Sequence, residues 1–201
     1  MNNVNNTIAN MFANKIKEKL DKALSLCNSP YVDGSRYEKF KLINTLSSLV
    51  SELLDKDDLK AKLIKLANTS SVNGNDNDIK IATFDLIRNI LVHFPIFEAW
   101  DDIYISKELL NWNRKYAGSI EKYFNDNKGK TLTYRMYLNE NNIWVERHTI
   151  TLTIPELQDG VDIYLKDFLS LDDAIWTFGI MDYYLKDLGL SINPYEFSVS
   201  M

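Results

Sequence analysis

The sequence has few cysteines, histidines and glycines, and each scarcity excludes a class of site. Cys27 is the one cysteine among 201 residues, so the chain cannot form an internal disulfide, as is usual in a reducing compartment. One cysteine and 2 histidines cannot assemble the usual Cys/His zinc sets. The 7 glycines are scattered, and none forms a nucleotide-binding loop. We therefore expect no cofactor and no Cys/His metal site.

Long apolar segments are also missing. No apolar run approaches the roughly 18 residues that a membrane-spanning helix needs. The first six residues are polar and uncharged, whereas a secretory signal begins with basic and then apolar residues. The sequence therefore predicts a cytoplasmic protein without a membrane partner.

The formal net charge of −5 argues against a protein that coats nucleic acid generally. Residues 155–201 contain two lysines against nine acidic residues, so the first 154 residues are nearly balanced and a local phosphate site there is not excluded. The acidic segment is typical of a solvated face. With 45% hydrophobic and 12% aromatic residues, the chain has enough apolar side chains to bury a core.

Apolar residues recur every three or four positions in several segments, which predicts amphipathic helices. We expect Pro95 to end one helix at Phe94 and Ser106 to cap the next helix. We expect Ser170 to cap the last helix and Gly189 to end that helix. The polar segment SSVNGNDND, residues 70–78, predicts a loop. The helices are expected at residues 4–27, 35–54, around 59–66, 79–94, 106–125 and 170–188.

The pattern changes to alternation in residues 130–138 and 143–154, which are rich in Thr, Tyr, Val and Ile. The polar residues 139–142 between them favour a hairpin turn. The predicted fold class is therefore mainly α, a helical bundle of about five to six helices with an inserted β-hairpin near residues 130–154. We expect a bundle in residues 1–126, with the hairpin and the C-terminal helix of residues 127–201 packed on the same domain.

Arg88 and His93 are the candidate catalytic pair. Five residues apart on a helix, they lie about 140° apart around its axis, and the long Arg side chain can reach toward the imidazole. Histidine exchanges a proton near neutral pH, and a guanidinium binds phosphate through two parallel hydrogen bonds. In the last helical turn, the helix dipole is expected to favour the imidazolium form of His93. In a purely structural alternative, Arg88 pairs with Asp85 or Glu98, and His93 is a half-buried, hydrogen-bonded residue.

The segment Arg88-Asn89-Ile90-Leu91-Val92-His93 resembles the signature of the HEPN superfamily, an Arg and a polar residue followed after a short gap by a His on a bundle helix. The resemblance implies a homodimer whose two signature helices line one cleft, and a metal-independent endoribonuclease of toxin–antitoxin or defence systems. His93 would then be the acid/base group, Arg88 would stabilise the phosphorane, and Asn89 would orient one of them or contact RNA. An antitoxin or sensor protein is the further partner implied. The resemblance spans residues 1–126, and only the six-residue segment is specific.

A second group of basic and aromatic residues lies on the predicted hairpin. Arg135, Trp144 and Arg147 are candidate RNA-binding residues, because alternating cations and rings can hold a nucleic-acid strand. The structural alternative is a half-solvated ribbon that contacts no ligand.

Two other functions remain open at this point. The chain would be a non-catalytic helical protein-interaction module if Arg88 and His93 serve only the fold. It would be a metal-dependent enzyme if Asp101 and Asp102 bind a divalent ion, although carboxylates at a helix start more often stabilise that helix.

Overall fold

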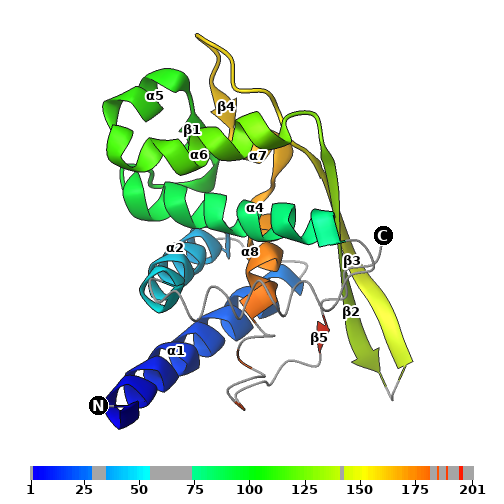
Figure 1. The fold of residues 1–201 in the computed structure, drawn as a ribbon. Coiled ribbons are helices and arrows are strands. Elements are labelled where there is room, and N and C mark those ends of the chain that lie inside the picture. Colours follow the sequence, from blue (N-terminus) through cyan, green and yellow to red (C-terminus); the bar gives the residue numbers. More distant parts are fainter. Residues whose placement is uncertain are drawn as a thin grey trace.

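The computed structural model describes residues 2–28, 35–54, 74–140 and 143–181, together with residues 185, 189, 195 and 196. Over these residues the protein is mainly helical, with an antiparallel hairpin beside the helices (Figure 1). The predicted fold class is therefore confirmed. The helix expected around residues 59–66 lies outside the described residues.

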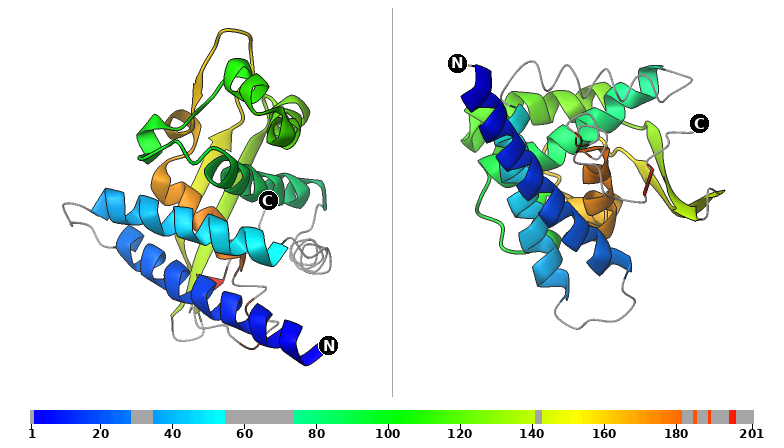
Figure 2. Two further views of the ribbon diagram at one scale, coloured as in Figure 1. Left: turned by 90° about the vertical axis from the view of Figure 1, so that its left-hand side faces the viewer. Right: turned by 90° about the horizontal axis from the view of Figure 1, so that it is seen from below.

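Helices α1 (Asn2–Asn28) and α2 (Ser35–Leu54) lie side by side, as the two ribbon views of Figure 2 show. Both follow the predicted bounds closely. Their facing sides supply much of the core, because the apolar residues of each recur on one stripe. The fully buried residues here include Ile16, Leu20, Ile43, Leu46 and Val50.

Helix α4 (Gly74–His93) packs against α2 and carries the candidate pair. The helix ends at His93, one residue before the end expected from Pro95. The Phe94 amide donates a helical hydrogen bond to the Ile90 carbonyl. The prediction of a loop over residues 70–78 is wrong from Gly74 onward, because the helix begins there instead of at residue 79. Asn, Asp and Gly are unfavourable inside helices but are common at helix N-termini, so this composition did not exclude a helix start.

The single helix expected over residues 106–125 is two helices, α5 (Lys107–Trp112) and α6 (Arg114–Asn127). Ser106 caps α5 as predicted, accepting a hydrogen bond from the Leu109 amide at 3.1 Å. The break falls at Asn113, whose backbone angles (φ −125°, ψ 65°) are not helical. The side chain of Asn113 donates to the His93 carbonyl at 3.3 Å, so the break joins this junction to the end of α4.

The predicted hairpin is confirmed as β2 (Thr131–Glu140) and β3 (Ile143–Thr153), with a bulge after Met136. Short strands that the alternation did not indicate complete the sheets: β5 (Tyr195–Glu196) pairs with β2, and β1 (Tyr104–Ile105) pairs with β4 (Ile163–Tyr164). Strands of two residues are too short to show a period.

The C-terminal part of the chain inserts into the helical core. The 3-10 helix η1 (Trp100–Asp102) lies earlier in the chain, between α4 and β1. In the C-terminal part, helix α7 (Leu165–Phe168) is followed by helix α8 (Leu171–Thr177), which begins after the predicted cap Ser170. The helix expected to continue to residue 188 is interrupted by the 3-10 helix η2 (Phe178–Ile180). At this interruption the Phe178 ring lies edge-on to Phe84 of α4, with ring centroids 4.7 Å apart, so the 3-10 turn coincides with a packing contact between α4 and the C-terminal part.

Gly189 has the positive φ (72°) expected where a helix ends. Among the described residues, no helix has both the length and the apolar character to span a membrane.

Candidate functional site

The Arg88 guanidinium lies in a polar cluster between α2, α4 and α6. Its Nε lies 3.8 Å from Asp85 Oδ1, its Nη1 donates to Ser51 Oγ at 3.4 Å, and its Nη2 donates to Asn89 Oδ1 at 2.8 Å. The side chain is only 16% exposed. Within the described part of the chain, the buried Nε has no hydrogen-bond partner. The structure thus places Arg88 in the ion pair with Asp85 that the structural alternative predicted.

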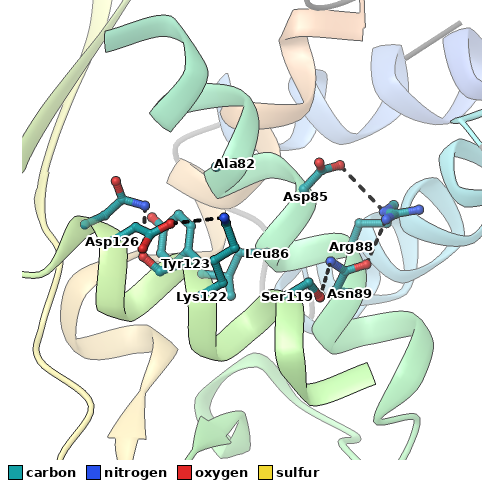
Figure 3. A pocket seen from close by; sticks show the side chains of 10 residues that line it. Ala82, Asp85, Leu86, Arg88, Asn89, Ser119, Lys122, Tyr123 and Asp126 are labelled. Atoms are coloured by element: carbon teal, nitrogen blue, oxygen red, sulfur yellow. Dashed lines mark hydrogen bonds and ion pairs between the residues drawn. The ribbon is translucent and has the colours of Figure 1, made fainter. Parts of the chain in front are cut away.

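Asn89 continues the cluster to α6. Its side chain is buried, accepts from Arg88, and donates to Ser119 Oγ at 3.2 Å (Figure 3). The two bonds fix the orientation of the amide, since its oxygen faces the guanidinium and its nitrogen faces Ser119. The hydrogen bond from Arg88 restrains the guanidinium, while the catalytic role that the resemblance implies for Asn89 stays a prediction.

A pocket of about 410 Å³ opens beside this cluster, between α4 and α6. Its second cation, Lys122, lies 3.6 Å from Asp126, so each cation of the pocket is paired with a carboxylate on its own helix (Figure 3). A phosphate would have to compete with these carboxylates for the cations. The lining residues are Ala82, Asp85, Leu86, Arg88, Asn89, Ser119, Lys122, Tyr123, Asp126 and Asn127.

Tyr123 forms the buried end of the pocket. Its hydroxyl is hydrogen-bonded to the Thr83 hydroxyl at 2.8 Å, and burial raises the pKa of Tyr123 to about 12. The phenol therefore stays protonated at neutral pH, and its hydroxyl is bonded to Thr83, which is not a lining residue of the pocket.

His93 is the last residue of α4 and does not line this pocket. Its side chain is half-buried, and its pKa is lowered from the ordinary 6.5, first by burial and then by the positive charges of Arg88 and Lys115. The expectation that the imidazolium form of His93 is favoured is therefore wrong, because burial and two cations lower its pKa. At neutral pH the imidazole is neutral and able to accept a proton.

The structure thus joins Arg88 and Asn89 by a direct hydrogen bond, and the positive charge of Arg88 lowers the pKa of His93. The side chains of Arg135, Trp144 and Arg147 lie outside the described part of the structure. Their backbones lie on the hairpin, with Arg135 opposite Thr149 and Trp144 opposite Asn139. RNA binding by these residues therefore stays a prediction.

Asp101 and Cys27 each have a side-chain partner. Asp101 pairs with Arg36 of α2, and among the residues that the structure describes, no group of three or more His, Cys, Asp or Glu side chains could hold a metal ion. Cys27 donates through Sγ to Asp172 Oδ1 at 3.4 Å, and burial raises the pKa of this thiol. A protonated, half-buried thiol is a poor nucleophile.

Several residues of the site carried no signal in the sequence. Ser51, Ser119 and Lys122 come from two helices far from Arg88 in the chain, and no motif connects them. Only the spacing of Ser119, Lys122 and Asp126, which places them on one face of a helix, could have suggested a shared surface.

Comparisons of the chain with models of protein families, with curated proteins and with solved structures find no match.

Proposed function

We propose that this protein is a metal-independent endoribonuclease of the HEPN type. The observation that supports the proposal is the environment of His93, a half-buried imidazole whose pKa is lowered by burial and by two cations, one of them Arg88 of the same motif. Two cations beside a neutral imidazole combine attraction for a phosphate with a group that accepts a proton near neutral pH.

In this proposal, His93 removes the proton from a ribose 2′-hydroxyl. The 2′-oxygen then attacks the adjacent phosphorus, Arg88 stabilises the charge on the phosphorane oxygens, and the bond to the 5′-oxygen breaks. The leaving oxygen takes a proton from water or from a protonated imidazole. The products are a 2′,3′-cyclic phosphate and a 5′-hydroxyl, so atoms and charge balance without a metal or cofactor.

A homodimer would place a second imidazole and a second guanidinium in the site, which one copy does not bring together. His93 lies outside the pocket that Arg88 lines, and both cations of the pocket are paired with carboxylates. Two α4 helices facing each other would bring a second imidazole and a second guanidinium to one phosphate. The resemblance suggests a cytoplasmic toxin or defence effector, with an antitoxin or sensor protein controlling it.

The test is cleavage of total RNA and transfer RNA in the presence of a chelator, by wild type, His93→Ala and Arg88→Ala. We expect cleavage by wild type and its loss in both variants, while Tyr37→Ala, which changes an exposed aromatic residue of α2, cleaves normally. Circular dichroism must show that every variant folds. Equal cleavage by all four proteins, or none by folded wild type, would contradict the proposal.

The alternative is a non-catalytic helical protein-interaction module. The hydrogen bonds of Arg88 to Ser51 and of Asn89 to Ser119 favour it, because they join α4 to α2 and to α6. This alternative predicts that RNA remains intact with wild type and that Arg88→Ala lowers the free energy of unfolding.

A further inference from the structure

The junction between α5 and α6 presents an aromatic ring and two cations beside His93. Trp112, the last residue of α5, is 72% exposed, the largest exposure among the large hydrophobic side chains that the structure describes. Arg114 and Lys115 follow in the first turn of α6 and are also exposed. A tryptophan exposed to this degree loses the free energy that burial would give it, so a ligand that covers the ring would be favoured.

Two observations place this junction next to His93. The Asn113 side chain donates to the His93 carbonyl at 3.3 Å, which fixes the junction against the end of α4. The charge of Lys115 is near enough to lower the pKa of the imidazole. Trp112 therefore precedes, and Arg114 and Lys115 follow, a residue that is hydrogen-bonded to the backbone of the candidate base.

The junction also has a concave surface, lined by residues that lie on either side of Trp112 in the sequence. A pocket of about 300 Å³ lies along α5 and α6, lined by Leu110, Asn111, Arg114, Ala117, Gly118 and Glu121. The amide of Asn111 and the carboxylate of Glu121 offer donors and acceptors to the edge of an unstacked base. Gly118 leaves the wall open, because no atom lies within 4 Å of the position that a Cβ would take.

We propose that this junction, residues 110–121, binds single-stranded RNA and delivers it to His93. Trp112 stacks on a base, and Arg114 and Lys115 bind backbone phosphates. An exposed ring followed by cations is the combination by which proteins hold single strands, since every base has a face for stacking and every nucleotide has a phosphate. This inference rests on the proposed ribonuclease function, for which it supplies the substrate-binding surface and a preference for single strands.

The experiment measures binding separately from cleavage. The probe is a fluorescein-labelled single-stranded RNA in which every 2′-hydroxyl is methylated, so that it cannot be cut by 2′-oxygen attack. Fluorescence anisotropy is recorded in chelator for wild type, Trp112→Leu and Trp112→Phe, with Tyr37→Leu as the matched control on α2. The same sequence annealed to its complement is the second probe.

We expect Trp112→Leu to weaken binding about 5- to 150-fold, the range for loss of one stacked base, and Trp112→Phe to retain most of the affinity. Tyr37→Leu should bind as wild type does, and the duplex should bind more weakly than the single strand because its bases are not free to stack. In the double variant Arg114→Gln/Lys115→Gln, the negative slope of log affinity against log salt should become less steep by about 1.4, which is about 0.7 for each phosphate that the variant no longer neutralises.

The outcomes separate this inference from the proposed function. Cleavage of unmodified RNA by wild type, with unchanged probe binding by Trp112→Leu, overturns the inference and leaves the ribonuclease. Binding that depends on Trp112, without any cleavage, supports the junction and overturns the ribonuclease. If Trp112→Leu instead changes the sedimentation coefficient and not RNA affinity, the ring is a contact between copies of the chain and the inference is wrong.

Discussion

Replacing Arg88 by Met should cost the protein about 2–4 kcal/mol of the free energy of unfolding. Asp85, whose side chain is 19% exposed, loses a cation 3.8 Å away, and an ion pair at this degree of burial lies between the fully exposed and fully buried cases, about 1–3 kcal/mol. Asn89 loses a donor 2.8 Å away, which adds about 1 kcal/mol. Methionine retains most of the aliphatic packing, so the loss reports the polar interactions.

A double-mutant cycle tests this origin. In Asp85→Asn/Arg88→Met the carboxylate is removed together with the guanidinium, so the double variant should be more stable than the sum of the single losses predicts, by about 1–2 kcal/mol. Urea unfolding followed by circular dichroism measures each free energy. Losses that simply add, or a loss below about 0.5 kcal/mol in Arg88→Met, would refute the ion pair as a contributor to stability.

This cost bears on the assignment of Arg88 to catalysis. An Arg88 variant that cleaves no RNA is informative only at a temperature and urea concentration at which it is fully folded, because part of its loss comes from the fold. His93 is the cleaner test, since its side chain is half-buried at the helix end and its carbonyl remains for Asn113 to bind.

Three further predictions concern single side chains. Because the pKa of His93 is lowered in the folded state, the unfolded chain binds more protons than the folded chain as pH falls from about 7 to 5. Wild type should therefore lose free energy of unfolding over this range, and His93→Gln should lose less. Equal shifts of the urea midpoint in the two proteins would contradict this prediction. Cys27, whose thiol pKa is raised by burial, should react with iodoacetamide much more slowly in the native protein than in urea, and equal rates would show the thiol to be activated. Gly118→Ala should raise the free energy of unfolding by about 0.5–1 kcal/mol, since its Cβ meets no atom and alanine favours a helix; a lower thermal midpoint would show that the added methyl group is not accommodated.

Periodicity predicted most of the long elements because their burial follows one face. In α1 and α2 the buried residues recur every three or four positions. At the described end of the hairpin, the buried residues Leu132, Ile150 and Leu152 alternate with more exposed ones. Errors arose where tertiary interactions override the local pattern. The side chain of Asn113 bonds to the end of α4 and accompanies a break in a segment whose apolar spacing is continuous, and the packing of Phe178 on Phe84 accompanies the 3-10 turn after α8.

The site was predictable only as far as it lies on one helix. Arg88, Asn89 and His93 could be identified because they lie close together in the sequence. The lowered pKa of His93 could not be predicted, since it depends on burial of the imidazole and on Lys115 of another helix. Ser51 and Ser119 are likewise joined to Arg88 and Asn89 only in three dimensions. No rule of local spacing connects residues on separate helices.

The most direct test of the ribonuclease proposal is the chemistry of the ends in RNA treated with wild type in chelator, compared with folded His93→Gln. The proposal predicts 2′,3′-cyclic phosphates and 5′-hydroxyls with wild type, and no new ends with the variant. New ends carrying 5′-phosphates, or the same cyclic ends from His93→Gln, would contradict proton transfer by His93 and with it the proposed mechanism.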